Sequence, residues 1–298
     1  MQQELLIAIL AGLGGMFGWG FAEFATKKSV DKIGFIACLV WAHVFGSIIL
    51  FSYLLLELFL FKHLIVLPAT ISEWLGLVFF GSLQAIVYFY AYKGFERGQV
   101  AVLSPIFASF SGLVALLSVF VFGEVLKTNL VLALVLIFLG IMFLNIDVAG
   151  LKAKRIRIVG APGFKEIGIA TVLATFWTLG WDKFIGEKDW AIYSFLMFIF
   201  MTILAFIISK LHRVDLSKVK PGIWKYLWLI GLGEAGAYLA ISLGYASTSF
   251  TSIIAILSGA SSLPTILLAR IFLKEKVAAI QTLGSLIVII GIILLSIS

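Results

Sequence analysis

The sequence is dominated by long apolar runs separated by short polar segments. A helix that crosses a bilayer needs about 20 mostly apolar residues, and the runs lack the alternating pattern of membrane strands. The pattern therefore predicts ten transmembrane helices. Their approximate ranges are 5–26, 33–56, 74–95, 100–122, 129–146, 166–186, 190–209, 224–245, 250–272 and 277–297.

Composition and charge agree with a membrane protein. Charged residues make up 12% of the chain, against roughly 25% in soluble domains. The net charge of +7 does not indicate nucleic acid, because Lys and Arg flank the apolar runs, and we expect the lipid bilayer as partner. Of the 22 Lys and Arg, 18 follow odd-numbered spans and 4 lie on the opposite side. This bias predicts an integral protein of the cytoplasmic membrane with both termini outside the cytoplasm.

The chain also repeats itself at an offset of 150 residues. Matching pairs are Trp74 and Trp224, Gly81 and Gly231, Gln84 and Glu234, Tyr88 and Tyr238, and Gly94 and Gly244. Each half holds five spans, so the second copy must be inverted. We predict an all-α polytopic membrane protein of two inverted five-helix repeats, 1–146 and 166–298, joined by a basic cytoplasmic linker, 147–165. Such repeats are typical of secondary transporters, although chance matches in apolar sequence are the alternative.

Three segments carry a family resemblance. They are GMFGWGFAEF with Trp19-Gly20, SPIFASFSGLVALLSVFVFGE ending in Gly123-Glu124, and ILSGASSLPTILLARIFLKE ending in Lys274-Glu275. The chain resembles the EamA-type, ten-helix branch of the drug/metabolite transporter superfamily over nearly its whole length. The resemblance implies a small-solute transporter that works by alternating access, with a central cavity lined by spans 1, 3, 4, 6, 8 and 9. Lys274 replaces a Gly of the family pattern, and Pro105 and Pro264 precede their glutamates at unequal distances, so matched hinges are not assured.

Glu234 is the first candidate for chemistry. It follows Trp224 by ten residues and precedes Tyr245 by eleven, which predicts a place near the bilayer centre. An ionised group there costs several kcal/mol, so the acid should face a wet cavity, pair, or hold a proton. A protonated acid that only joins helices is the alternative. The surrounding G-x-G-x-x-G does not predict a nucleotide site, because the flanks are apolar and no acid follows before Glu275.

Four more polar residues are predicted to lie within the membrane spans. Tyr238 lies one helical turn after Glu234, and Gln84 and Tyr88 repeat the pair in the first half. The two patches are predicted to face each other across the repeat axis. His43, near the middle of the second span, is either a proton relay or a satisfied core residue.

Three tryptophans lie on spans that the resemblance places around the cavity. Trp19, Trp177 and Trp181 could hold an organic cation against their faces. Packing against lipid or anchoring at the interface is the commoner use of membrane tryptophan. The sequence leaves both readings open.

Four further acids lie toward the ends of spans, namely Glu23, Asp182, Glu124 and Glu275. Lys27 follows Glu23 at i+4 and Lys183 adjoins Asp182, which favours solvated ion pairs. A role in gating is the rival interpretation. Glu124 and Glu275 lie close to lysines and are predicted to be structural.

These features favour a secondary active transporter of a small organic solute that uses Glu234 for proton coupling or exchange. The predicted spans place no Lys or Arg at mid-membrane, which argues against a polyanion, and the acid with its aromatic neighbours favours an amino acid or organic amine. A passive facilitator of sugars or nucleosides is the alternative. An intramembrane enzyme is a weaker one, because the chain has one Cys and no H-E-x-x-H. We expect no metal and no cofactor.

Overall fold

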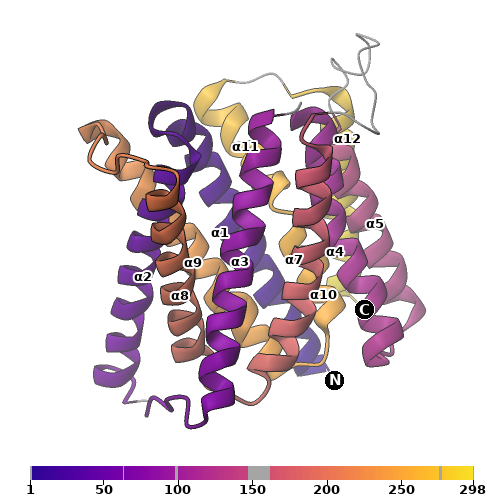
Figure 1. The fold of residues 1–298 in the computed structure, drawn as a ribbon. Coiled ribbons are helices and arrows are strands. Elements are labelled where there is room, and N and C mark those ends of the chain that lie inside the picture. Colours follow the sequence, from indigo (N-terminus) through magenta and orange to yellow (C-terminus); the bar gives the residue numbers. More distant parts are fainter. Residues whose placement is uncertain (1, 63, 98–99, 147–161, 275–276, 298) are drawn as a thin grey trace.

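The protein is a bundle of long helices that lie roughly side by side (Figure 1). A computed structural model describes residues 2–62, 64–97, 100–146, 162–274 and 277–297. Within these residues the regular structure is entirely helical. The predicted linker 147–165 lies outside this part up to residue 161.

The helices follow the predicted spans closely. The first half holds α1 (Gln2–Ile33), α2 (Phe35–Phe59), α3 (Ile71–Arg97), α4 (Val100–Phe122) and α5 (Thr128–Leu144). The second half holds α7 (Phe164–Ile185), α8 (Trp190–Leu211), the short η1 (Pro221–Ile223), α9 (Trp224–Ser247), α10 (Thr251–Gly259), α11 (Ser262–Leu273) and α12 (Ala279–Ser296). In the described part, seven segments are long and apolar enough to cross a membrane. Two shorter apolar helices, in α4 and α5, and the interior helix α7 complete the ten crossings.

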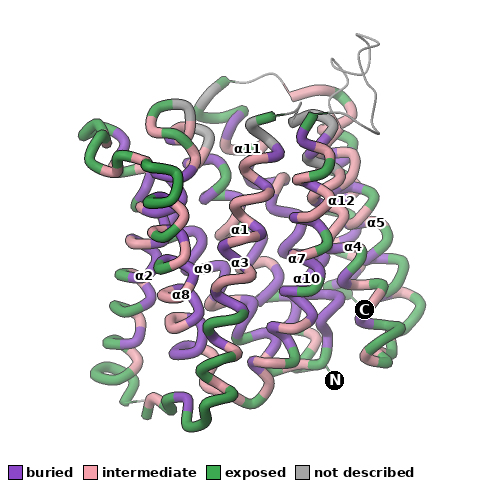
Figure 2. The backbone as a smooth tube through the Cα atoms, in the orientation of Figure 1, coloured by how far each residue is buried: buried purple, intermediate pink, exposed green. Residues whose placement is uncertain are grey.

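Both ends of the chain lie at the same end of the bundle (Figure 1). That placement requires an even number of crossings and agrees with two halves of five. Buried positions line the interior and exposed ones the outside of the bundle, most visibly along α2 and α5 (Figure 2). An apolar outer surface on a helical bundle is what lipid contact requires.

The helix contacts are symmetric under exchange of the two halves. α1 packs on α9 as α7 packs on α3, and α1 packs on α10 as α7 packs on α4. α2 packs on α9 as α8 packs on α3. The remaining main pairs join equivalent helices, α2 with α8, α4 with α10, and α5 with α12. This pattern is that of two inverted five-helix repeats, which confirms the predicted fold class.

The ninth span differs from its prediction because it is two half-helices. α10 ends at Gly259 and α11 begins at Ser262. Pro264 lies in the first turn of α11, where its missing N–H leaves no helix bond unmade, whereas within a continuous helix it would clash with the preceding turn. Its counterpart in the first half, α4, runs unbroken through position 105. Only the second half has this discontinuity among the described helices.

Candidate functional site

A buried acid and a buried histidine meet inside the bundle. Glu234 of α9 and His43 of α2 face each other with 3.5 Å between Glu234 Oε2 and His43 Nε2. Their side chains are 4% and 0% exposed, respectively. The sequence offered no partner for His43, and the structure provides one from the other half of the chain.

The hydrogen bonds of His43 determine where a proton must lie. His43 Nδ1 is 2.6 Å from the Leu39 carbonyl oxygen, which can only accept, so Nδ1 carries a hydrogen. In neutral His43 the other nitrogen, Nε2, is therefore an unprotonated acceptor that faces a Glu234 oxygen. Two acceptors in a dry interior repel each other unless a proton lies on one of them. A favourable contact between these two atoms therefore needs a proton on one of them.

Tyr238 joins the polar residues of the two repeats. Its hydroxyl accepts a hydrogen bond from Gln84 Nε2 at 2.7 Å. It also lies 3.4 Å from the Tyr88 hydroxyl, to which it donates. The repeat-related pairs, Gln84 with Tyr88 and Glu234 with Tyr238, are thus brought into direct contact across the bundle.

Aromatic rings surround Tyr238. Trp19, Trp177 and Phe198 meet its ring edge to face, with centroids 5.7, 5.7 and 5.5 Å away, respectively. His43 stacks on Phe198 at 5.0 Å, so the aromatic group is continuous with the acid and histidine. Such rings attract cations over their faces.

The other tryptophan contacts are mainly structural. Trp177 donates from Nε1 to the Phe80 carbonyl at 3.0 Å. Trp181 stacks on Trp177 at 5.7 Å and donates to Ser242 Oγ at 3.0 Å. Trp181 therefore supports Trp177 rather than touching Tyr238 in the aromatic group.

Several polar atoms of this cluster have no partner. Five buried side-chain atoms among the described residues lack a hydrogen bond, and four of them belong to the cluster. They are Trp19 Nε1, His43 Nε2, Gln84 Oε1 and Glu234 Oε2. Buried polar atoms are normally paired, so the gathering of four unpaired atoms in one cluster distinguishes it from the rest of the described interior.

The centre of the cluster is buried in this structure. Tyr238 and His43 are 0% exposed and Glu234 is 3% exposed. Side chains fill the centre of the bundle, where the resemblance implies a central cavity.

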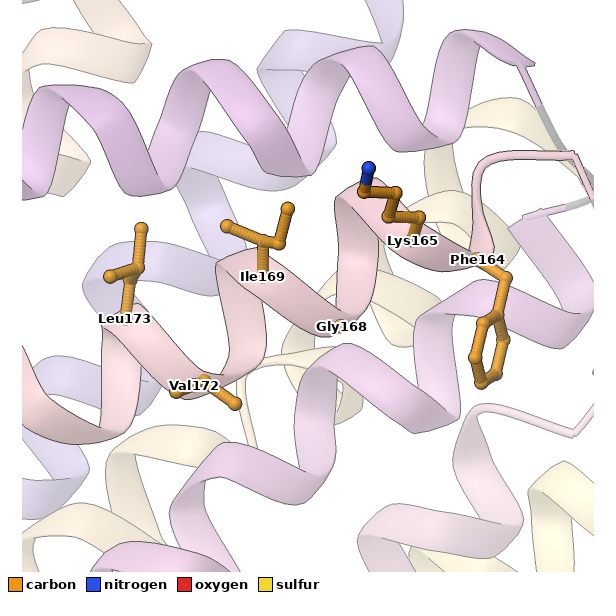
Figure 3. Close-up of a pocket in the computed structure, with 6 residues that line it drawn as sticks. All are labelled: Phe164, Lys165, Gly168, Ile169, Val172 and Leu173. Atoms are coloured by element: carbon orange, nitrogen blue, oxygen red, sulfur yellow. The ribbon is translucent and has the colours of Figure 1, made fainter.

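Two hollows lie away from the cluster. One, of about 400 Å³, is an apolar depression on α7 (Figure 3), lined by Phe164, Lys165, Gly168, Ile169, Val172 and Leu173. The other, of about 480 Å³, includes Glu73, Asp189, Trp190 and Tyr193. In the second hollow, Glu73 and Asp189 already accept backbone hydrogen bonds, from Ala69 and Val66, respectively. Neither hollow contains a residue of the polar cluster.

The acids near the helix ends bind hydroxyl groups. Asp182 lies 3.8 Å from Lys183 Nζ, but its side chain is only 5% exposed, so the pair is not the solvated one that was predicted. Asp182 also accepts from Thr251 at 3.0 Å. Glu23 accepts hydrogen bonds from hydroxyl groups of the ninth span. The Lys27 side chain and Glu275 lie outside the described part. Glu124 accepts from Ser252, and burial raises the pKa of its carboxyl above the ordinary value.

Sequence reasoning missed Phe198, which contacts both His43 and Tyr238. A single phenylalanine in an apolar span carries no signal that distinguishes it from lipid-facing residues. Only its place on the helix face opposite His43 identifies it. Ser242 was missed for the same reason, because its role depends on Trp181.

Two inverted repeats, a discontinuous helix and a buried polar cluster define an integral membrane protein of the transporter class. The model of the EamA-like transporter family matches residues 6–146 and 167–297, and the chain belongs to that family. It is therefore a membrane transporter of small solutes. A solved structure titled "Crystal structure of protein" is similar in fold, with a TM-score of 0.78, 15% identity and 97% coverage of each chain. A search of the curated proteins found no significant match to the sequence.

Proposed function

We propose that the protein is a proton-coupled secondary active transporter of an organic amine or amino acid, working by alternating access. The observation that carries this proposal is the Glu234–His43 pair, with 3.5 Å between facing acceptor atoms and the histidine tautomer determined by Leu39. Such a pair takes up one proton and releases it only when another positive group or water replaces it. Proton movement is thereby linked to occupation of the site.

The substrate class follows from what surrounds Glu234. An ammonium group and a proton both neutralise one carboxylate, so each excludes the other. The faces of Trp19, Trp177 and Tyr238 supply the aromatic surface that organic cations favour. Gln84 and Tyr88 add an amide and a hydroxyl for a polar substrate group. Competition at Glu234 gives exchange of one substrate cation for one proton.

The purified protein in proteoliposomes tests the coupling. A thermal-shift screen of amines, amino acids, sugars and nucleosides first identifies a ligand, since a ligand that binds only the folded state stabilises it. With an imposed pH gradient, we expect the labelled ligand to accumulate beyond equal concentrations. When a proton ionophore collapses the pH gradient, the ligand concentrations inside and outside the vesicles should become equal. Uptake that reaches only equality in both conditions would instead identify a passive facilitator.

The orientation in the membrane is a further part of the proposal. The excess of Lys and Arg after odd-numbered spans favours an orientation with both termini outside the cytoplasm. We expect an epitope tag after Ser298 to react with antibody on intact cells. A tag in the linker around Arg155 should react only after permeabilisation. The reverse pattern would contradict the orientation without affecting the fold.

A further inference from the structure

The two halves of the broken ninth span are each tied to carboxylates on other helices. The N-terminal end of α10 is bound by Asp182 and Glu124, and the N-terminal end of α11 is bound by Glu23. α10 lies toward the end of the bundle that holds both termini, and α11 toward the opposite end (Figure 1). Glu23 and Asp182, which were predicted to form solvated ion pairs, and Glu124, which was predicted to be structural, thus hold the only discontinuous span among the described helices.

The α10 latch consists of Asp182, Glu124 and their two partners. Thr251 Oγ1 donates to Asp182 Oδ2 at 3.0 Å. Ser252 donates to Glu124 twice, from its backbone N–H at 3.1 Å and from Oγ at 2.5 Å. Glu124 follows α4 and Asp182 is near the end of α7, so this latch joins α10 to two separate helices.

The α11 latch consists of Glu23, Ser261 and Thr265. Ser261 Oγ donates to Glu23 Oε1 at 2.8 Å. Thr265 Oγ1 lies 2.9 Å from Glu23 Oε2 and also within 3.1 Å of the Gly20 carbonyl. A charged acceptor forms the stronger bond, so Glu23 joins the start of α11 to α1.

We propose that these carboxylates are positioning residues of the transport cycle that release the two half-helices alternately. The inference rests on the alternating access of the proposed function, and it assigns the two gates. Because the span is interrupted between Gly259 and Ser262, α10 can leave its latch while α11 stays bound, and the reverse. Each release opens the buried cluster toward one face of the bundle, and the hydrogen bonds of both latches are formed in this structure.

Hydrogen–deuterium exchange of the full chain in lipid nanodiscs tests this assignment without a substrate. Glu23→Gln weakens the α11 latch, and we expect roughly tenfold faster exchange in residues 262–273. Exchange in residues 251–259 should become slower, because molecules that open at α11 keep the α10 latch closed. Asp182→Asn should have the opposite effect, with faster exchange in residues 251–259 and slower exchange in residues 262–273. Asp215→Asn, in an exposed loop pair with Lys218, is the matched control and should change neither segment.

Slower exchange in the half-helix whose latch is intact distinguishes gating from a purely structural role. If each variant only speeds exchange at its own end, or speeds both ends together, the alternate release is wrong. Ser261→Ala removes one of the two hydroxyl groups that bind Glu23. It should change exchange at both ends in the same directions as Glu23→Gln, to a smaller extent, which covers the case that Glu23→Gln folds poorly. The readout needs neither a pH gradient nor a ligand, so its failure is separate from failure of proton coupling at Glu234.

Discussion

Glu234→Gln should abolish accumulation driven by a pH gradient while leaving the protein folded. The glutamine side chain has the size of the acid, and its amide N–H can donate to His43 Nε2. It therefore replaces the shared proton with a hydrogen that cannot leave. The cluster keeps its packing and loses the carboxyl group that the proposed function assigns to proton exchange.

The expected effect is large and can be stated as a ratio. One pH unit is worth about 1.4 kcal/mol per proton, which sustains about a tenfold concentration ratio for one-to-one coupling. Wild-type protein should approach this ratio in proteoliposomes, and Glu234→Gln should reach only equal concentrations. Labelled ligand inside the vesicles is the measurement, with the thermal melting curve as the check of folding.

Glu57→Gln supplies the matched control for this prediction. Glu57 lies on α2 near its end and accepts a hydrogen bond from Tyr53, so the same chemical change is made away from the cluster. His43→Phe keeps a ring to stack on Phe198 and removes the nitrogen that faces Glu234. We expect it to slow driven uptake. If Glu234→Gln accumulates the ligand as strongly as wild type, the proposed coupling role of Glu234 and His43 is wrong.

The sequence predicted the number and extent of the spans because these depend on composition alone. The excess of apolar residues and the bilayer thickness set where each helix begins and ends. The repeat offset also predicted a long-range contact, since Tyr88 and Tyr238 are 150 residues apart and meet at their hydroxyls. Both successes come from properties that do not require knowing how each helix is rotated.

The remaining site features depend on helix rotation and on local breaks, which hydropathy does not specify. His43 and Glu234 face each other only because α2 packs on α9 with these sides inward. The pairing of Glu23 with Ser261 depends on the interruption before α11. Pro264 signalled a hinge, but the family pattern alone could not say that α4 stays continuous. Polar residues in an apolar span identify candidates, and packing decides their partners.

The glycines around Glu234 also show that helix packing decides the role of a residue that the sequence pattern leaves open. The G-x-G-x-x-G spacing of Gly231, Gly233 and Gly236 predicted no nucleotide site, and the structure gives two of the three a packing role. A Cβ on Gly233 would lie 2.5 Å from the Gly18 carbonyl oxygen, and one on Gly231 would lie 2.6 Å from the Gly46 nitrogen. A Cβ on Gly236 would meet nothing within 4 Å.

Gly233→Ala should therefore destabilise the protein and Gly236→Ala should not. At position 233 the methyl group collides with the backbone of α1, because it would lie 2.5 Å from the Gly18 carbonyl oxygen. The approach is close from both sides, since a Cβ on Gly18 would lie 2.5 Å from the Gly233 carbonyl oxygen. Close helix approach through small residues is a main source of packing in membrane bundles, and overpacking it costs about 1–3 kcal/mol. At position 236 the change only adds helix propensity, worth up to about 1 kcal/mol in the favourable direction.

Thermal unfolding of the two variants in the same lipid measures the difference, which should have opposite signs relative to wild type. Gly233→Val extends the test, since its larger side chain should prevent the approach of α1 to α9 altogether. Separating these helices also displaces Glu234, the next residue, from His43 on α2, so transport should fall together with stability. Equal melting temperatures for Gly233→Ala and Gly236→Ala would mean that α1 and α9 are not in backbone contact, and that the cluster is not held where the structure places it.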